Sequence, residues 1–311
     1  MSKKTLTIGT RGSALALWQA RHIMERLQAG NPHLRLQLRT VKTHGDLVRD
    51  RALSQVGGRG LFVKEIENAL LDHEIDLAVH SLKDMPTELP SDLMLGAILA
   101  RADARDALVF RGGQKDLSEL PHGSRVGTSS LRRRAQLLSE RPDLEILDLR
   151  GNVDTRLRKL YAGEYDAVVL AAAGLDRLGH GEAIGQCLPV EVMLPAVGQG
   201  ALCAEVRADN EVVRRLLAPL DHPPTRQAAT AERAFLHRLE GGCQVPIAAY
   251  GQVGGIQLRL RGLVASPDGS RVVKDELSGP PDEAVRLGTC LAEQVLESGG
   301  EEILEEIRRD G

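Results

Sequence analysis

The segment from Thr5 to Leu27, TLTIGTRGSALALWQARHIMERL, decides how the first part of this chain folds. Its first residues, Thr5 to Gly9, predict a short strand. From Leu15 onward, apolar residues recur at the spacing of one helix face. Ser13 lies where an N-cap is expected, because its hydroxyl can accept a backbone N–H from the first helical turn. The segment therefore predicts a strand, a polar turn and an amphipathic helix.

The same order recurs further along the chain. Val126-Gly127-Thr128 precedes two serines and a helical stretch, as Ile8-Gly9-Thr10 precedes the first long helix. Further short strands, with helical sequence between them, are expected at 34–41, 77–80, 145–149 and 167–171. This alternation is typical of α/β lobes with largely parallel sheets. The repeated register predicts two similarly built lobes.

The pattern changes after Pro223-Pro224. One helix is expected to about Leu239. The strand-like stretches 247–253, 257–264 and 271–277 follow. A helix that starts near Pro281 and another over 301–309 are expected after them. This is an α+β module of domain size. Polar residues 100–105 and the stretch 194–200 are expected to connect the two lobes. We therefore expect domain 1 at 1–99 and 200–219, domain 2 at 105–194 and domain 3 at 222–311.

Composition limits the classes of partner. The chain has 311 residues, of which 42% are hydrophobic and 27% charged, and its net charge is −3. This balance gives no overall attraction to nucleic acid or membrane, and 2% aromatic residues are too few for a base-stacking surface. The four cysteines have no metal-binding spacing, and no apolar run suits a signal peptide or membrane span. We expect a cytoplasmic protein without a metal.

Arginines and hydroxyls gather where the predicted strands meet helices. The chain has 32 Arg and 8 Lys, and four arginine-bearing turns lie at 10–13, 128–134, 150–156 and 174–177. In α/β lobes such turns lie at the carboxyl edge of the sheet, where ligands bind and helix N-termini attract anions. Together they predict one ligand with several acidic groups in a cleft between the lobes. The alternative is that these turns are ordinary N-caps with solvated arginines, and that the excess of arginine reflects GC-rich codon usage.

Two further segments carry candidate groups. Lys83 and Asp84, in HSLKDMP, follow a buried-looking strand, where a carboxylate can stabilise a developing cation. A structural ion pair is the alternative for these two residues. Residues 43–60 have little regular pattern and contain Arg59 among glycines. Two interpretations of this segment remain, a lid and a disordered surface loop.

Cys243 lies in LEGGCQVP, where two preceding glycines and a following proline predict a turn. A thiol in such a turn can be reached from solvent or from a neighbouring domain. A small buried hydrophobe is the alternative, and a metal-binding or redox role is disfavoured by the cysteine spacing. The chain has no Walker loop, GxGxxG, HExxH or GxSxG motif, so phosphate-loop, dinucleotide, zincin and serine-hydrolase functions lack support.

Seven stretches, in the same order along the chain, are similar to those of one enzyme family: IGTRGSALALWQA from Ile8, GLFVKEIE from Gly60, HSLKDMP from His80, VGTSSLRRRAQL from Val126, LRGNVDTRL from Leu149, LPAVGQGAL from Leu194 and LEGGCQVPIAAYG from Leu239. On these motifs the chain resembles the porphobilinogen deaminase family (hydroxymethylbilane synthase) along nearly its whole length. The resemblance implies an α/β fold with two lobes of the type II periplasmic-binding-protein kind and a smaller α+β C-terminal domain. It also implies a monomer.

The resemblance implies a transferase of tetrapyrrole and heme biosynthesis. Such an enzyme joins four porphobilinogen molecules, with loss of ammonia, on a dipyrromethane cofactor and then releases hydroxymethylbilane by hydrolysis. Here Cys243 would hold the cofactor through a thioether. A non-catalytic binding protein for a small polyacid is the rival, and it predicts an unmodified Cys243.

The resemblance also assigns individual residues. Asp84 would be catalytic and would face the pyrrole N–H groups. The groups that would bind the cofactor carboxylates are Ser13, Lys83, Thr128, Ser129, Ser130, Arg132 and Arg133. The groups that would bind substrate or the elongating chain are Arg11, Arg150, Arg156 and Arg177. Arg59 stands where the family often has lysine and would belong to a lid. Leucine at Arg132, Arg133 or Arg156 is expected to impair function far more than stability.

Overall fold

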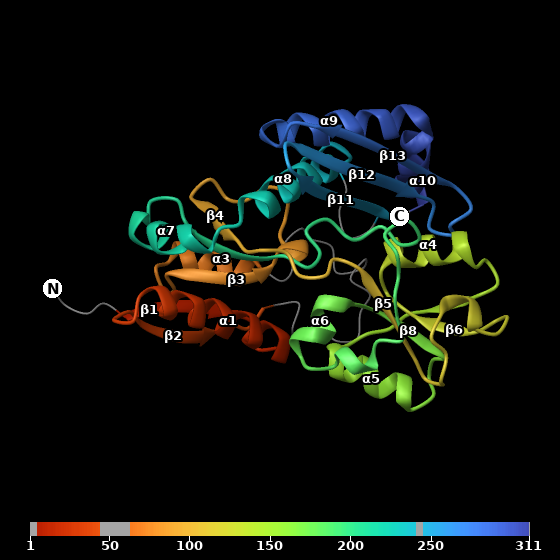
Figure 1. Ribbon diagram of the computed structural model, residues 1–311, viewed down its shortest axis with the longest axis horizontal. Helices are drawn as coiled ribbons and strands as arrows, with labels where there is room; N and C mark the ends of the chain where they lie inside the picture. Colours follow the sequence, from red (N-terminus) through yellow and green to blue (C-terminus); the bar gives the residue numbers. More distant parts are fainter. Residues whose placement is uncertain (1–4, 44–62, 241–244, 311) are drawn as a thin grey trace. The chain divides into compact units, whose positions relative to one another are not determined.

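The computed structural model describes residues 5–43, 63–240 and 245–310 of the chain (Figure 1). It divides into two compact units. Unit one comprises residues 1–102 and 201–226, and unit two comprises residues 103–200 and 227–311. No helix in the described ranges is long and apolar enough to cross a membrane.

Unit one is a five-stranded sheet between helices. Its strands, in spatial order, are β2 (Arg35–Thr40), β1 (Thr5–Thr10), β3 (Leu77–Ser81), β10 (Leu202–Arg207) and β4 (Leu93–Ile98). β1 is parallel to β2 and β3, whereas β10 is antiparallel to β3 and β4. Helix α1 (Ala14–Gly30) packs through Ile23 on one face of the sheet. Helix α3 (Lys64–Leu71) packs through Ile66 on the other.

Unit two contains a second sheet with the same strand order. Its strands are β7 (Glu145–Leu147), β6 (Arg125–Gly127), β8 (Ala167–Ala171), β5 (Asp106–Phe110) and β9 (Gln186–Cys187). β6 is parallel to β7 and β8, and β5 is antiparallel to β8 and β9. Helices α4 (Leu131–Glu140), α5 (Val153–Tyr161) and α6 (Ala172–Arg177) follow β6, β7 and β8.

The shared strand order confirms the prediction of two similarly built lobes in an α/β fold of the type II periplasmic-binding-protein kind. In each sheet one strand, β10 or β5, is antiparallel to its neighbours, and each of these strands begins where the chain enters that unit. The sequence pattern did not predict β4, β5, β9 or β10. Their pairing is set by partners far away in sequence, which local periodicity does not report.

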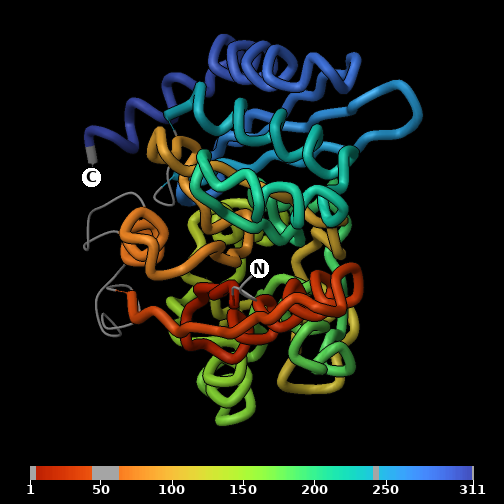
Figure 2. The backbone as a smooth tube through the Cα atoms, turned by 90° about the vertical axis from the view of Figure 1, so that its left-hand side faces the viewer, coloured from red at the N-terminus to blue at the C-terminus, as the bar shows by residue number. Residues whose placement is uncertain are grey.

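The C-terminal part of unit two is the expected α+β module. Helix α8 (Pro223–Arg238) leads to a sheet of β11 (Ile247–Gly254), β12 (Gln257–Ala265) and β13 (Val272–Gly279). α9 (Ala284–Val295) and α10 (Glu301–Asp310) follow, and Figure 2 shows both (blue) beside this sheet. The helix expected to start near Pro281 is α9, and a short 3₁₀ turn, Pro281–Glu283, precedes it.

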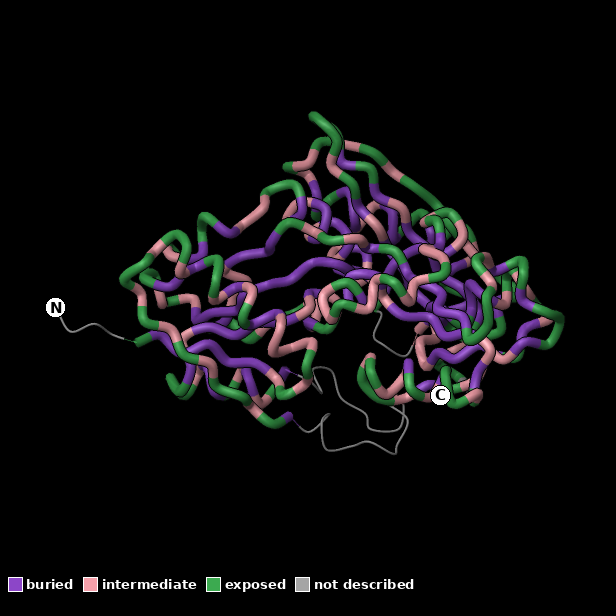
Figure 3. The backbone as a smooth tube through the Cα atoms, turned by 60° about the horizontal axis from the view of Figure 1, so that its bottom comes forward, coloured by how far each residue is buried: buried purple, intermediate pink, exposed green. Residues whose placement is uncertain are grey.

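The helices of this module share a tight core with its sheet. A Cβ atom on Gly288 of α9 would lie 2.2 Å from the carbonyl oxygen of Ala231 on α8, so the two helices meet backbone to backbone. The opposite face of the sheet contributes Leu263, which is buried in a cluster with Ala135 of α4. Figure 3 colours the backbone by burial and shows the buried residues (purple) in continuous stretches.

Candidate active site

The predicted catalytic pair lies in a turn at the end of β3. The strand ends at Ser81, and a single 3₁₀ turn, Leu82–Asp84, follows. The turn is anchored because Leu82 is buried and its N–H donates to the carbonyl of Ala201 at 3.0 Å. Lys83 is half-buried and Asp84 is exposed. Within the described residues, the Asp84 carboxylate makes no hydrogen bond or ion pair, so the structure does not use it as a structural ion pair.

The first arginine-bearing turn joins β1 to α1 in unit one. Ser13 is the N-cap of α1, and its hydroxyl accepts the N–H of Ala16 at 3.2 Å, as predicted. Arg11 lies between the strand end and this cap and is half-buried. The Thr10 hydroxyl donates to the carbonyl of Ala16, which fixes the turn from the strand side.

In unit two, the hydroxyls before α4 have defined partners. Ser130 is the N-cap of α4, and its own N–H donates to the hydroxyl oxygen of buried Thr128 at 3.2 Å. The Ser129 hydroxyl donates to the carbonyl of Leu149 at 2.8 Å and accepts its N–H at 3.1 Å. Ser129 therefore ties this turn to the segment that leads to Arg150.

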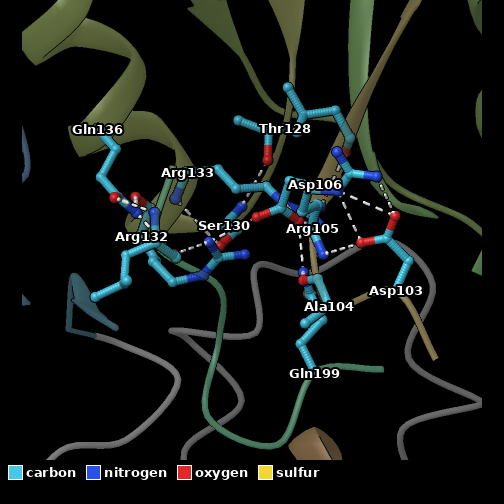
Figure 4. A network of polar contacts seen from close by, with 12 residues as sticks. Asp103, Ala104, Arg105, Asp106, Thr128, Ser130, Arg132, Arg133, Gln136 and Gln199 are labelled. Carbon is cyan, nitrogen blue, oxygen red and sulfur yellow. Dashed lines mark hydrogen bonds and ion pairs between the residues drawn. The ribbon is translucent and has the colours of Figure 1, made fainter. Parts of the chain in front are cut away.

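Arg132 and Arg133 lie on α4 with their guanidinium groups buried against Asp106 of β5 (Figure 4). Nη1 of Arg132 donates to Asp106 Oδ2 at 2.7 Å and to the carbonyl of Leu194 at 2.7 Å. Nε and Nη2 of Arg133 donate to Asp106 Oδ1 at 2.9 and 2.7 Å, and Nη1 donates to the carbonyl of Val169 at 2.9 Å. Both arginines thus belong to a buried ion-pair network.

Asp106 is the centre of this network and is fully buried. Gln199 also donates to its Oδ1, at 3.0 Å, and to the carbonyl of Ala104 at 2.7 Å. Burial acts to raise the pKa of Asp106, but the cations of Arg132 and Arg133 overcome it and hold the pKa well below its usual range. Burial lowers the pKa of Arg133, against the attraction of Asp106.

Asp106 and Gln199 are not among the site residues predicted from the sequence. A lone carboxylate within the apolar run DALVF was a usable signal, since a buried charge needs a partner and the arginine-rich start of α4 supplies it. Gln199 lies in the segment expected to connect the lobes, where no periodic pattern identified its role.

Arg150 and Arg156 lie at the start of α5, whose N-cap is Asn152. Nε of Arg156 donates to the carbonyl of Gly151 at 2.8 Å. Desolvation and the charges of Arg133 and Arg150 lower the pKa of Arg156 to about 10. In the part of the chain that the structure describes, neither Arg150 nor Arg156 has a carboxylate partner, so positive charge accumulates here.

Arg177 lies at the C-terminal end of its helix, whereas the sequence predicts it at the N-terminal end. α6 begins at Ala172, directly after β8, so Gly174 to Arg177 form the body and last turn of a helix rather than its N-terminus. Arg177 Nη2 donates to the carbonyl of Gly200 at 2.7 Å. Desolvation lowers the pKa of this guanidinium to about 10. The helix N-terminus therefore does not contribute to an anion site beside Arg177.

Two predicted functional residues, Cys243 and Arg59, lie outside the described residues, as does all but the first residue of the candidate lid. The other three cysteines, Cys187, Cys203 and Cys290, are free thiols, and Cys203 is buried. No group of three or more metal-ligating side chains occurs within residues 5–43, 63–240 and 245–310.

Comparison with solved structures gives distant likenesses. A probable amino-acid ABC transporter extracellular-binding protein from Bacillus subtilis is 13% identical over 70% of this chain and 91% of its own, with a TM-score of 0.41. A TRAP periplasmic solute-binding protein from Desulfovibrio salexigens is 11% identical over 71% of this chain and 73% of its own, with a TM-score of 0.43. The fold assignment rests on the strand order above.

Comparison with protein families and curated sequences is more specific. Residues 6–215 match the family model "Porphobilinogen deaminase, dipyromethane cofactor binding domain", and residues 226–297 match "Porphobilinogen deaminase, C-terminal domain". A porphobilinogen deaminase of Geobacter metallireducens is 54% identical over 99% of this chain and 96% of its own. One from Carboxydothermus hydrogenoformans is 50% identical over 99% of both chains. The chain therefore belongs to the porphobilinogen deaminase family.

Proposed function

We propose that this chain builds hydroxymethylbilane on a dipyrromethane cofactor that is attached to Cys243 through a thioether. Polymerisation of porphobilinogen in tetrapyrrole synthesis is the activity of the family to which the chain belongs. The anchoring cysteine and the roles of individual residues are the proposal. When bound, the cofactor supplies the pyrrole ring carbon to which the first substrate is joined.

The cationic cluster at the start of α5 is the observation that carries the proposal. Each pyrrole unit bears acetate and propionate groups, so the growing product is a polyanion. The pKa of Arg156 is lowered because its charge is desolvated and lies near Arg133 and Arg150. A ligand carboxylate would relieve this repulsion and accept charge-assisted hydrogen bonds. The residues present therefore fit a polycarboxylate ligand.

The two arginines proposed to bind the cofactor differ in how many of their nitrogen donors already make hydrogen bonds with described residues. Among the described residues, Arg132 uses only Nη1, which leaves Nε and Nη2 for a cofactor carboxylate. Arg133 already uses all three nitrogens, so its contribution is mainly its charge. The remaining proposed cofactor ligands are Ser13, Lys83, Thr128, Ser129 and Ser130. Arg11, Arg150, Arg156 and Arg177 are proposed to bind the substrate and the elongating chain.

Asp84 is proposed to act on the reacting pyrrole. Loss of ammonia breaks a C–N bond of porphobilinogen, and the resulting cation forms a C–C bond with the next ring, which then loses a proton. A carboxylate held at a fixed position stabilises the developing positive charge and can accept a proton. Asp84 suits this role because it is exposed on an anchored turn and has no partner among the described residues.

Intact-mass measurement tests the anchoring residue. We expect purified protein to exceed its sequence mass by two linked pyrrole units. Cys243→Ser should lose this excess, whereas Cys290→Ser, a half-buried thiol of the same C-terminal module, should keep it. An unmodified mass in a folded sample that does not consume porphobilinogen would contradict the proposal and favour a binding protein for a small polyacid.

We also propose a monomer with three domains, at 1–99 with 200–219, 105–194 and 222–311. One family-model match ends at 215 and the other begins at 226, close to the proposed boundary between 219 and 222. A cytoplasmic location is proposed because the described cysteines are free thiols. Light scattering coupled to size-exclusion chromatography checks the monomer.

A further inference from the structure

The hairpin turn between β12 and β13 touches the backbone of α4. Gly269 of this turn is buried and has a φ of +73°. A Cβ atom at this position would lie 2.3 Å from the carbonyl oxygen of Ala135 and 2.7 Å from the backbone nitrogen of Ser139. An α-helix joins these two groups by its own hydrogen bond, so neither can turn away as a side chain can. Glycine is therefore required where the turn meets α4.

The turn is held in shape by its own side chains. The Asp268 carboxylate accepts hydrogen bonds from the Ser266 hydroxyl at 2.6 Å and from the N–H and hydroxyl of Ser270 at 3.1 and 2.9 Å. These hydrogen bonds, first that of the Ser266 hydroxyl, lower the pKa of Asp268 to about 2. The Ser266 hydroxyl also accepts the N–H of Arg271 at 3.0 Å. The turn is therefore a preformed support for the helix that it touches.

α4 is short enough to carry a displacement from this contact to its arginines. The helix has ten residues, and Ala135 lies within one turn of Arg132 and Arg133. Gln136 accepts the N–H of Leu194 at 2.7 Å through its side-chain oxygen and donates to the carbonyl of Leu194 at 3.1 Å. Arg132 donates to the same carbonyl. A shift at Ala135 therefore reaches the residues that hold the first turn of the helix.

The sheet of the C-terminal module meets the same part of α4. Ala248 of β11 and Leu263 and Ala265 of β12 are buried in one cluster with Ala135. The cluster packs against the Ala135 side chain, whereas Gly269 packs against the helix backbone. The module therefore supports α4 both through its sheet and through the 266–271 turn.

We propose that Gly269 is a positioning residue: its turn sets the position of α4, and thereby that of the guanidinium groups of Arg132 and Arg133. The module that is proposed to hold the cofactor on Cys243 then also fixes the arginines proposed to bind the cofactor carboxylates. The effect on turnover rests on those proposed roles, whereas the support of α4 by the turn does not.

Nitrogen-15 NMR of arginine-labelled, cofactor-loaded protein tests the positioning directly. The Nε–H of Arg133 donates to Asp106 Oδ1 in a buried site, which protects it from exchange, and its signal is the one that disappears in Arg133→Lys. We expect this signal to shift in Gly269→Ala, because the added Cβ displaces α4. Gly255→Ala is the matched control and should leave the signal unchanged. Gly255 is also a left-handed glycine in a hairpin turn of this module, but nothing lies within 4 Å of a Cβ added there.

A second pair of variants separates the contact from the backbone conformation. Asparagine adopts the left-handed region more readily than alanine, so Gly255→Asn should melt at a higher temperature than Gly255→Ala. At position 269 both residues add the same Cβ, so Gly269→Asn should shift the Arg133 signal as Gly269→Ala does. An unshifted signal in Gly269→Asn would show that the backbone conformation, and not the contact, is responsible, and would contradict the proposal.

Steady-state kinetics test the consequence for the reaction. Gly269→Ala should lower kcat per cofactor-loaded molecule about fivefold and change KM less than about twofold, because Arg132 and Arg133 are proposed to act on the bound cofactor rather than on the incoming substrate. Gly255→Ala should leave both constants unchanged. A purely structural role would reduce the amount of folded enzyme and leave kcat of each loaded molecule as it was.

The outcomes separate this proposal from the proposed function. An Arg133 signal that stays in place in Gly269→Ala, or that shifts equally in Gly255→Ala, would overturn the positioning role. A shifted signal with unchanged kcat would support the positioning role and contradict the proposed roles of the two arginines. If Gly269→Ala does not fold, Asp268→Ala, which loosens the turn without adding an atom at position 269, should shift the same signal, and an unchanged signal would again overturn the proposal.

Discussion

Asp106 Oδ1 accepts hydrogen bonds from both Nε and Nη2 of Arg133, at 2.9 and 2.7 Å, in a site closed to solvent. The contact joins β5, where the chain enters unit two, to the first turn of α4. Arg133, which the sequence assigns to ligand binding, therefore has a second role in the core of its lobe. Arg133 stabilises its lobe, in addition to the ligand binding proposed for it.

We expect Arg133→Leu to lower the free energy of unfolding by about 3–5 kcal/mol, because it leaves the buried Asp106 carboxylate with fewer counter-charges. This changes the expectation from sequence, in which leucine at Arg133 affects function far more than stability. Urea unfolding followed by circular dichroism measures the loss. Arg134→Leu, on the exposed side of the same helix, is the control, and an equal effect of both variants would contradict the prediction.

The Asp106 network should make unit two sensitive to acid. Because the folded-state pKa of Asp106 is depressed, the carboxylate stabilises the fold at pH values above its unfolded pKa, and this contribution is lost as the pH falls below about 5. The difference in unfolding free energy between the unmodified chain and Asp106→Asn should therefore be largest near neutral pH and shrink in acid. Asp148→Asn, which replaces an exposed carboxyl, is the control. A difference that is independent of pH would contradict this assignment.

Arg156 should show the opposite balance of function and stability. Its lowered pKa means that folding disfavours the charged guanidinium, so Arg156→Gln should not lower the unfolding free energy through loss of charge. Loss of a charge-assisted hydrogen bond to a ligand carboxylate should reduce kcat/KM for porphobilinogen about tenfold or more. Parallel urea unfolding and porphobilinogen-consumption assays check both parts. Strong destabilisation with unchanged kcat/KM would reverse the assignment.

Asp84→Ala should abolish most turnover without unfolding the protein. Removal of a positioned acid–base or electrostatic group costs about 10²- to 10⁴-fold in rate. The exposed carboxylate has no partner within the described residues, so little stability depends on it. Ammonia release under saturating porphobilinogen measures the rate, and a thermal melt measures stability. Near-normal ammonia release from the variant would disprove the role.

Glu232 should be a strong stabiliser of unit two. Its buried carboxylate accepts the N–H of Gly198 at 2.7 Å and that of Gly251 at 2.8 Å, and so ties α8 to β11 and to the segment before β10. Glu232→Ala leaves both donors buried and should cost about 3 kcal/mol or more in unfolding free energy. Glu293→Gln, which alters an exposed ion pair, should cost little. Comparable costs in the two variants would show that the Glu232 contacts are weak.

The local sequence predicted the features that depend on only a few neighbouring residues. Ser13 was correctly predicted as an N-cap because a cap depends on its own turn and the next three residues. The helix predicted to end near Leu239 ends at Arg238, and the three C-terminal strands lie within two residues of their predicted bounds. These elements alternate or repeat in ways that a short window detects.

Pairing between distant segments was the part that sequence did not predict. β10 pairs with β3 across more than a hundred residues, so His80 and Glu205 gave no sign of their contact. The lone Asp106 signals a buried charge that needs a partner, but only the structure shows that α4 brings two guanidinium groups to it. The predicted position of Arg177, at a helix N-terminus, was wrong because α6 follows β8 with no intervening turn.

The sequence by itself determined the alternation of strands and helices, the caps, the arginine-bearing turns and, through its motifs, the family. All of these depend on residues close together in the chain. Only the tertiary structure decided which charges are neutralised within the protein, because that depends on which side chains share a buried environment. Arg132 and Arg133 share Asp106, whereas Arg150 and Arg156 have no carboxylate partner in the described ranges. This difference separates the arginines that hold the lobe together from those available to an acidic ligand.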